Sequence, residues 1–374
     1  MKELIRILCV FGRLDRGGAE SMCMNLYRQI DRTKIQFDFV KHTNEKGAFE
    51  DEINELGGKI YTAPAFRIVN YTQYCNWWKK HLYAHPEHTI IHGHMFTISS
   101  VYFGIAHKLN RVTVGHSHSS NPNGRSLNIK NIIKNIIRRR VPNTSDYCLA
   151  CSDNAGKFLF GNKEYFVLKN AINTDWFIFN PDKRNNMRKK FDYSDFDIVI
   201  CIVASFTEPK NPLGVVDIFN IIHADNPNTK LLWVGDGPLR NSFQEKVREC
   251  GLSDAVKLLG VRNDTFDILQ AADIFMLGSI FEGLPVSAIE AQASGLPCLL
   301  SDGISKETAI TNLCHFLPID KPELWSKAIS SIDFNNRRNT KNDIVVAGYD
   351  VETTAKWLEE FYTNIIKERN LKDE

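Results

Sequence analysis

Short apolar runs alternate with longer segments in which apolar residues recur every three or four positions. The short runs predict buried strands, and the longer segments predict helices. The expected strands of a first series cover residues 5–11, 36–41, 59–62, 89–92, 112–116, 147–150 and 165–168. Helix-length segments such as 19–30 and 99–109 separate them. Repeated strand–helix units predict a parallel, doubly wound sheet that binds ligands at the carboxyl ends of its strands.

A second series of strands follows, at residues 198–204, 229–235, 256–259, 274–277, 297–301 and 314–317. The segment 174–197 between the two series is rich in charge and has no strand pattern. We therefore expect two Rossmann-like α/β domains, at residues 1–180 and 190–350, with a ligand site in the cleft between them. Apolar residues within 351–370 have helical spacing, which predicts a terminal helix.

Composition narrows the class of protein. The chain has 374 residues, of which 43% are hydrophobic and 24% charged, as is typical of soluble globular proteins. A net charge of +2 is too small to attract nucleic acid strongly. Nine scattered cysteines favour a reduced, cytoplasmic setting. Cys148 and Cys151 have C-x-x-C spacing, but no second pair completes a zinc site, which disfavours a metal or redox role.

No leader or membrane span is expected. The apolar run near the start is interrupted by Arg6, and no cleavage site of small residues follows it. No run approaches the ~20 apolar residues of a membrane span.

The most informative stretch covers residues 281–291, which read as a strand-to-helix turn with a glutamate near each end. Pro285 suits the first turn of a helix, and Gly283 permits a close backbone approach just before it. The start of this helix therefore offers free N–H groups to a phosphate. The carboxylates of Glu282 and Glu290 only accept hydrogen bonds, which suits sugar and ribose hydroxyls.

Residues 281–302 resemble the donor-site motif of retaining glycosyltransferases with the two-domain GT-B fold, in the large family 4 group. They are most similar to bacterial members that build capsular and exopolysaccharide repeats. Matching motifs cover nearly the whole chain, at Gly17-Gly18-Ala19-Glu20, His116, Lys169-Asn170, Lys210-Asn211 and Gly235-Asp236-Gly237-Pro238. The resemblance implies an N-terminal acceptor domain, a C-terminal donor domain, a last helix that crosses back onto the first domain, and a hinge near residue 350.

The resemblance also implies roles on the donor side. The backbone of Gly283, Leu284, Pro285, Val286 and Ser287 would hold the diphosphate, Glu282 the sugar hydroxyls and Glu290 the ribose. Lys210 matches a family lysine that neutralises the leaving group. A solvated loop lysine is the plainer alternative.

One expected donor-side cation is missing. Ser205 stands where the family usually has an arginine, so one of two positive charges is absent. Arg262 and Arg240 are candidate substitutes, and the loop around Arg262 corresponds to the one that cradles the nucleobase in the family.

The glycine pair after the first strand opens a helix without Cβ obstruction. It does not read G-x-G-x-x-G, so a dinucleotide site is disfavoured. A flexible loop is one interpretation. The resemblance favours contact with the donor diphosphate or the acceptor, with Gly18 and Ala19 closest.

Histidines gather at the ends of two expected strands, at His92, His94, His116 and His118. Such pairs could ligate zinc, although no acidic residue stands among them, or they could be structural. The resemblance favours an active-site wall, with His116 facing the reacting sugar and the other three shaping the acceptor side.

Two further patterns bear on mechanism and location. Asp195-Phe196-Asp197 is a nominal D-x-D metal motif, but it precedes a strand, so we expect a metal-independent reaction without a cofactor.

Residues 127–141 form a basic amphipathic pattern, either packed on the sheet or placed against an anionic membrane surface at the inner face of the cell membrane.

The leading hypothesis is a retaining glycosyltransferase that uses a nucleotide-diphosphate sugar, expected to be UDP-linked, and a glycan or polyprenyl-linked acceptor. A sugar-nucleotide epimerase on the same scaffold is an alternative, disfavoured because the first-domain strands end in histidines rather than carboxylates. A non-catalytic partner of another transferase is a third hypothesis, supported by Ser205.

Overall fold

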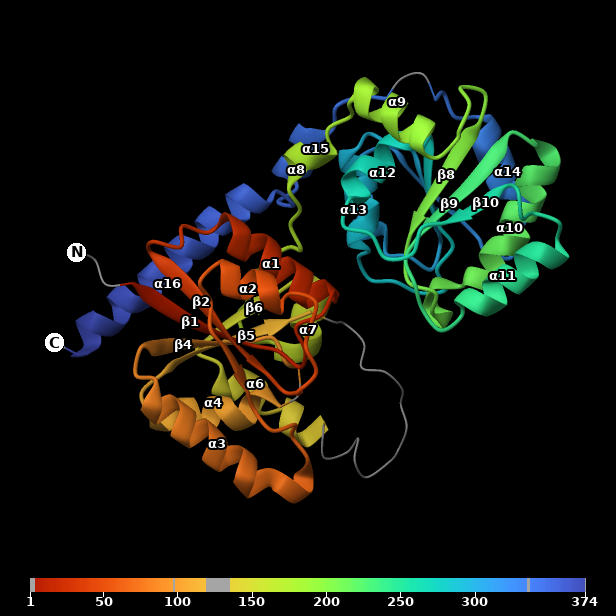
Figure 1. Ribbon diagram of the computed structural model, residues 1–374. Helices are drawn as coiled ribbons and strands as arrows, with labels where there is room; N and C mark the ends of the chain where they lie inside the picture. Colours follow the sequence, from red (N-terminus) through yellow and green to blue (C-terminus); the bar gives the residue numbers. More distant parts are fainter. Residues whose placement is uncertain (1–3, 97, 119–134, 335–336, 374) are drawn as a thin grey trace. The chain divides into compact units, whose positions relative to one another are not determined.

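The computed structural model describes residues 4–96, 98–118, 135–334 and 337–373. The chain forms two compact units (Figure 1). Unit 1 comprises Met1–Ala171 together with Val351–Glu374, and unit 2 comprises Ile172–Asp350.

Unit 1 is built on seven parallel strands in the order β3-β2-β1-β4-β5-β6-β7. Their bounds are β1 (Ile5–Val10), β2 (Ile35–Lys41), β3 (Ile60–Thr62), β4 (His88–Gly93), β5 (Val112–Ser117), β6 (Tyr147–Ala150) and β7 (Phe166–Val167). The strand order reverses between β1 and β4. In open α/β sheets this switch point is where ligands bind, beyond the carboxyl ends of the strands.

Helices cover both faces of this sheet (Figure 1). Because successive strand residues point to opposite faces, Ile7 and Cys9 pack with α1 and α16, whereas Leu8 and Val10 pack with α3 and α4. The helical elements are α1 (Gly18–Gln29), α2 (Glu50–Glu55), η1 (Ile68–Asn70), α3 (Tyr71–Ala84), α4 (Ser99–Lys108), α6 (Val141–Thr144), α7 (Asp153–Phe160) and α16 (Val351–Asp373).

The last helix, α16, belongs to unit 1 although it follows unit 2 in the chain. Its buried residues Ala355, Leu358, Tyr362 and Ile365 share one core with residues of α1, β1 and β2. Their spacing of three and four residues is the helical period seen in the sequence. None of the helices in the described part of the chain is long and apolar enough to cross a membrane.

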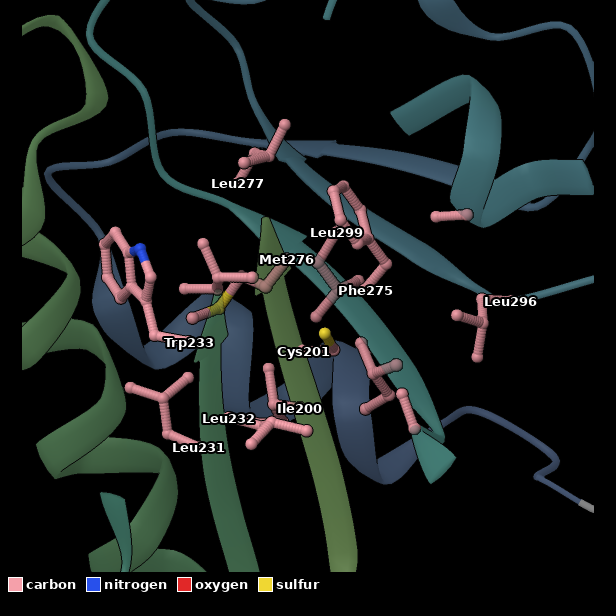
Figure 2. Close-up of a cluster of buried hydrophobic side chains, with 14 of the residues drawn as sticks. Ile200, Cys201, Leu231, Leu232, Trp233, Phe275, Met276, Leu277, Leu296 and Leu299 are labelled. Atoms are coloured by element: carbon pink, nitrogen blue, oxygen red, sulfur yellow. The ribbon is translucent and has the colours of Figure 1, made fainter. Parts of the chain in front are cut away.

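Unit 2 contains six parallel strands in the order β10-β9-β8-β11-β12-β13, so its switch point lies between β8 and β11. Their bounds are β8 (Ile198–Val203), β9 (Thr229–Val234), β10 (Val256–Leu258), β11 (Ile274–Leu277), β12 (Cys298–Ser301) and β13 (Cys314–Leu317). Figure 2 shows the buried core of these strands, in which Ile200, Trp233 and Met276 lie close together. The apolar sequences of these strands are uninterrupted because helices cover both faces of a parallel sheet.

The helical elements of unit 2 flank this sheet (Figure 1). They are α8 (Thr174–Phe177), α9 (Pro181–Lys190), η2 (Glu208–Lys210), α10 (Pro212–Asp225), α11 (Arg240–Glu249), α12 (Thr265–Ala271), α13 (Val286–Ala293), η3 (Lys306–Thr308), α14 (Pro322–Ser330) and α15 (Lys341–Val346). The predicted α/β class with two parallel sheets is confirmed, and every expected strand is found within one or two residues of its expected ends.

The charged segment 174–197 is not a linker but part of unit 2. It contains α8 and α9, and Arg184 and Arg188 of α9 bind the carboxylate of Asp273 at 2.6 Å and 3.0 Å. The chain crosses between the units at Ala171/Ile172 and at Asp350/Val351. These crossings are tied together on the unit 2 side, where the Ile172 N–H donates to the Tyr349 carbonyl at 2.8 Å. Charge density misled the boundary prediction because these arginines are paired rather than solvated.

Candidate active site

Three loops converge at the switch point of unit 2. They follow β8, β11 and β12, and they are joined by backbone hydrogen bonds. The Ile280 N–H donates to the Pro209 carbonyl at 2.8 Å, and the Ser305 N–H donates to the Glu282 carbonyl at 3.0 Å. Parallel strands end at the same sheet edge, so residues distant in sequence meet here.

Lys210 and Glu282 form an ion pair at this edge. Lys210 Nζ lies 2.5 Å from Glu282 Oε2, and the two side chains are 25% and 11% exposed. The hydroxyl of Ser279 donates to the other oxygen of the same carboxylate. The pair therefore presents an oriented carboxylate and an oriented cation in a partly desolvated setting, where charge interactions are stronger than in water.

Ser279 was not singled out from the sequence. It stands three residues before Glu282 and two residues after the end of β11. That spacing was the available signal, because a hydroxyl three residues before a carboxylate in a tight loop can reach it.

The loop after β8 is held in place by Asn211. This residue has a left-handed backbone, φ 53°, and its side-chain amide donates to the Gly278 carbonyl at 3.1 Å. A Cβ on Gly214 would approach the Asn211 amide to 2.5 Å, so a glycine is needed there. Asn211 thereby fixes the position from which Lys210 extends.

Helix α13 begins at Val286, one residue later than expected, with Pro285 as the N-cap. The Pro285 carbonyl accepts from the Ala288 N–H at 3.1 Å. No side chain caps the helix, so its start offers the N–H groups of Val286 and Ser287 to a ligand. Gly283 and Leu284 lie in the loop just before it.

Glu290 lies about one turn inside α13 and is half-buried. In the described part of the chain its carboxylate has no hydrogen-bond or ion-pair partner. Desolvation by burial raises its pKa to about 7. An unsatisfied acceptor beside a helix N-terminus is a suitable partner for hydroxyl groups.

The candidate substitute arginines are both held by local carboxylates. Arg262 binds Asp264 at 2.6 Å and 2.8 Å, and Arg240 Nη1 lies 2.8 Å from Asp236 Oδ2. Ser205 is exposed, and its hydroxyl lies 3.2 Å from that of Thr207. Within the described residues, Lys210 is therefore the cation that lies directly against Glu282.

The Gly235–Gly237 turn has a packing role. Both glycines have positive φ, at 140° and 159°. A Cβ on Gly235 would lie 2.0 Å from the Ala204 carbonyl oxygen, and one on Gly237 would lie 2.7 Å from that of Phe206. The turn thus packs directly against the backbone of the loop that carries Ser205, as its sequence indicates.

The D-x-D motif lies at the wrong end of β8 for a ligand. Asp197 precedes that strand and accepts from the N–H of Ser194 at 2.6 Å and from its hydroxyl at 2.8 Å. It closes a turn at the amino end of the strand, whereas ligands bind at the carboxyl ends.

In unit 1, the switch point lies beside the start of α1. Gly17 is the N-cap without a side-chain cap, and Gly18 is the first helical residue, followed by Ala19. A Cβ on Gly18 would meet no atom within 4 Å, so this end of the helix faces open space. A Cβ on Gly17 would lie 2.2 Å from Glu20 Oε2.

The four histidines form two stacked layers, which we call the histidine quartet: His92, His94, His116 and His118. In the first layer His92 Nε2 lies 3.2 Å from His116 Nδ1, and in the second His94 Nδ1 lies 2.9 Å from His118 Nε2. The layers stack with ring centroids 4.2 Å apart for His92 and His94, and 4.1 Å apart for His116 and His118. Residues two apart on adjacent strands produce this ladder.

Burial keeps the quartet uncharged. Desolvation lowers the pKa of His92 and of His118 to about 3, and lowers the pKa of His94 and of His116 well below the ordinary value. The rings are therefore neutral imidazoles near pH 7, each with one donor and one acceptor nitrogen.

The zinc alternative must be weighed against this geometry. Ligand nitrogens of His94, His116 and His118 lie within 4.8 Å of one another, and so do ligand atoms of Cys9, His92 and His94. However, the facing nitrogens are at hydrogen-bond distance. A metal ion between two imidazoles needs about 2.0–2.1 Å on each side. The geometry favours imidazole pairs that share protons.

The basic amphipathic segment is only partly described. Its residues 127–134 lie outside the described residues, so that prediction stays open there. Arg138 is described, and its guanidinium lies 4.6 Å from the Phe158 ring centroid and donates to the Phe158 carbonyl at 3.0 Å. This basic side chain packs on unit 1.

Comparisons with known proteins agree with this architecture. The model for "Glycosyl transferases group 1" matches residues 183–332, and that for "Glycosyltransferase Family 4" matches residues 16–176. The chain is 30% identical to EpsF of Bacillus subtilis (strain 168), which is named as a glycosyltransferase, over 98% of both chains. It is 22% identical to the capsular polysaccharide biosynthesis glycosyltransferase CapH of Staphylococcus aureus, over 96% of this chain and 99% of CapH.

Among solved structures, HepE of Anabaena in complex with UDP is similar, with a TM-score of 0.77 at 15% identity, covering 97% of this chain and all of that one. The glycosyltransferase WaaG, involved in lipopolysaccharide biosynthesis, has a TM-score of 0.73 at 15% identity over 96% of this chain and 99% of WaaG. These likenesses support the fold. The whole-length identity and the two family models show that this chain belongs to the family 4 group of glycosyltransferases with the GT-B fold.

Proposed function

We propose that this enzyme is a retaining, metal-independent glycosyltransferase of bacterial surface polysaccharide synthesis. It transfers a sugar from a UDP-sugar to a glycan or polyprenyl-linked acceptor at the inner face of the cell membrane. The likeness to EpsF supports a glycosyltransferase, the name of CapH supports the class of product, and the HepE complexes with UDP and with UDP-glucose support the class of donor.

Unit 2 supplies the donor chemistry in this proposal. Glu290 accepts hydrogen bonds from the ribose hydroxyls, and the N–H groups at the start of α13 bind the diphosphate. Glu282 accepts from hydroxyls of the donor sugar. Lys210 exchanges part of its contact with Glu282 for the diphosphate, whose negative charge grows as the bond to the sugar breaks.

The reaction is a substitution at the anomeric carbon. The bond from that carbon to the diphosphate oxygen breaks, and a bond to the acceptor hydroxyl oxygen forms on the same face. The hydroxyl proton passes to the departing diphosphate, so the products are the glycoside and UDP. Catalysis consists of binding the separating charges more strongly than the intact donor. The histidine quartet, being neutral, contacts sugar hydroxyls without adding charge.

The observation that carries this proposal is the half-buried carboxylate of Glu290, which has no partner among the described residues and lies beside an uncapped helix start. Its test is calorimetry with UDP. The Glu290→Ala variant should bind UDP roughly 10- to 100-fold more weakly, because a hydrogen bond to a charged group contributes about 1.5–3 kcal/mol. The exposed Glu245→Ala on α11 serves as the matched control. Unchanged affinity in a folded Glu290→Ala protein would remove the ribose assignment.

A non-catalytic role remains the second candidate, because Ser205 replaces a cation and both candidate substitute arginines are engaged by local carboxylates. A UDP-release assay with candidate donors and acceptors separates the two. Turnover that depends on acceptor supports the transferase. Tight UDP binding without turnover for any donor and acceptor supports the binding partner, and a changed donor sugar without acceptor supports an epimerase.

A further inference from the structure

A phenol of the last helix contacts the histidine quartet. Tyr362 of α16 is fully buried, and its Oη lies 2.6 Å from His92 Nδ1. Among the described residues this is the hydroxyl's hydrogen-bond partner. A buried O–H group that does not donate loses its hydration without compensation. Tyr362 therefore donates its proton toward His92 Nδ1, which must be the acceptor nitrogen of that ring.

This donation determines the proton positions of the first layer. A neutral imidazole that accepts at Nδ1 carries its hydrogen on Nε2. In His92 that Nε2–H faces His116 Nδ1 at 3.2 Å. His116 Nδ1 is consequently an acceptor as well, and the hydrogen of His116 is on Nε2.

His116 Nε2 is the open end of this chain of hydrogen bonds. His116 is 2% exposed, and its Nε2 has no partner among the described residues. A buried N–H without an acceptor costs free energy unless a ligand supplies one. The chain Tyr362–His92–His116 thus ends in a donor that requires an oxygen atom.

In the second layer, no contact with a described residue fixes which ring nitrogens carry the hydrogens. The His94–His118 pair leaves His94 Nε2 and His118 Nδ1 without partners, and the described residues include no phenol that binds either ring. Whichever nitrogen donates within this pair, one outer nitrogen is a donor and the other an acceptor. The second layer can adapt to a hydroxyl group, whereas the first cannot.

We propose that Tyr362 and His92 are positioning residues that hold His116 as an Nε2–H hydrogen-bond donor to an oxygen of the reacting sugar. This inference rests on the proposed function. It makes the last helix part of the active site, and it excludes His116 Nε2 as the base that takes the acceptor proton. It also explains why a phenol stands among the buried residues of α16.

The tautomers can be read without any activity assay. In protein labelled with ¹⁵N-histidine, long-range ¹H–¹⁵N spectra assigned by single His→Gln variants report which ring nitrogen bears hydrogen. We expect both His92 and His116 to carry it on Nε2. In Tyr362→Phe we expect His116 to become a mixture of both tautomers. Hydrogen on Nδ1 of His116 in the wild type, or an unchanged His116 tautomer in Tyr362→Phe, would overturn the proposal.

A matched control removes a different phenol that faces α16. Tyr147 of β6 donates to Glu368 at 2.6 Å, outside the histidine quartet. Tyr147→Phe should leave the His116 signals and turnover unchanged. If it alters them as Tyr362→Phe does, docking of α16 rather than the proton chain is responsible, and the proposal fails.

Kinetics add a test that a purely structural role would not satisfy. Tyr362→Phe should lower kcat about 10-fold without changing the affinity for UDP, because the affected bond is made to the sugar and not to the nucleotide. His92→Gln can accept from Tyr362 and donate to His116, so it should retain most activity, whereas His92→Leu should lose it. Equal losses for Gln and Leu would contradict the relay. If no variant, wild type included, transfers sugar while the tautomers are as expected, the proposed function fails and the assignment of His116 as a donor stands.

Discussion

The two units place opposite chemistry at equivalent points of the same topology. In each, the strand order reverses beside the first strand, between β1 and β4 in unit 1 and between β8 and β11 in unit 2. Unit 1 fills this point with the neutral, stacked histidine quartet. Unit 2 fills it with the Lys210–Glu282 ion pair and with the carboxylate of Glu290, which no described residue pairs with.

Under the proposed function, this difference divides one fold between two tasks. A diphosphate brings negative charge, so its site needs a cation and free N–H groups. Sugar hydroxyls bring none, so neutral donor and acceptor atoms suffice there, and a charge would have to be desolvated at a cost. The sheets provide equivalent positions, and the side chains at the strand ends decide which ligand each can bind.

The largest expected effect is on the charged side of this comparison. Lys210→Met should lower kcat by roughly 100- to 1000-fold, because removing one preorganised group that stabilises transition-state charge costs about 2.7–4 kcal/mol. Steady-state turnover with the natural donor measures it. Lys183→Met, which removes a surface pair with Asp267, is the control and should be neutral. If Lys210→Met turns over normally, Lys210 does not meet the leaving group.

The second prediction concerns pH and Glu290. Its pKa is raised to about 7 in the folded protein, above the ordinary value of 4.5. Between these values the unfolded chain has lost the proton and the folded chain keeps it, so stability falls as pH rises from about 4.5 to 7. Glu290→Gln removes this pH-dependent contribution to the free energy of unfolding. It should be more stable than wild type by roughly 2–3 kcal/mol at pH 8 and nearly equal at pH 4.5.

Urea unfolding of the ligand-free protein at the two pH values tests that expectation. The quartet contributes with the opposite sign over this range, because its imidazoles stay neutral in the folded protein but gain protons in the unfolded chain below the ordinary pKa of 6.5. The informative quantity is therefore the difference between Glu290→Gln and wild type, in which the contribution of the quartet cancels. A Glu290→Gln protein with the same pH dependence as wild type would mean that the carboxylate is ionised at neutral pH.

A smaller effect is expected from restoring the missing cation. Ser205→Arg should tighten UDP binding about three- to fivefold at low salt, since an exposed charge contributes on the order of 1 kcal/mol or less. The gain should shrink as ionic strength rises. Calorimetry at two salt concentrations measures both. Weaker binding would indicate that the position of Ser205 is too close to Lys210 for a second charge.

The smallest expected effect is that of metal removal. EDTA should leave turnover largely intact, because in the proposed mechanism Lys210 and the helix start neutralise the diphosphate, and the D-x-D motif lies at the opposite strand end. Loss of activity that manganese or magnesium restores would show that the donor site of unit 2 needs a divalent metal ion. Loss of activity that only zinc restores would instead indicate a metal site at the histidine quartet.

Much of the fold was predictable because its signals are local. Each apolar run became a parallel strand, since a strand buried on both faces must be apolar at every position. The domain boundary was less predictable. The cationic α9 looks solvated in sequence, yet Arg188 is buried against Asp273, and no local pattern reveals a partner 85 positions away.

The sequence alone determined the elements, the two sheets and the residue types at the strand ends, because these depend on short-range periodicity and on turn chemistry. Only the tertiary structure decided which side chains contact one another. Lys210 pairs with Glu282, Ser279 binds the same carboxylate, and Tyr362 binds a histidine 270 positions earlier. Those contacts depend on strand order and on the return of the last helix. Such long-range geometry is set by the packing of the whole core, which no window of sequence contains.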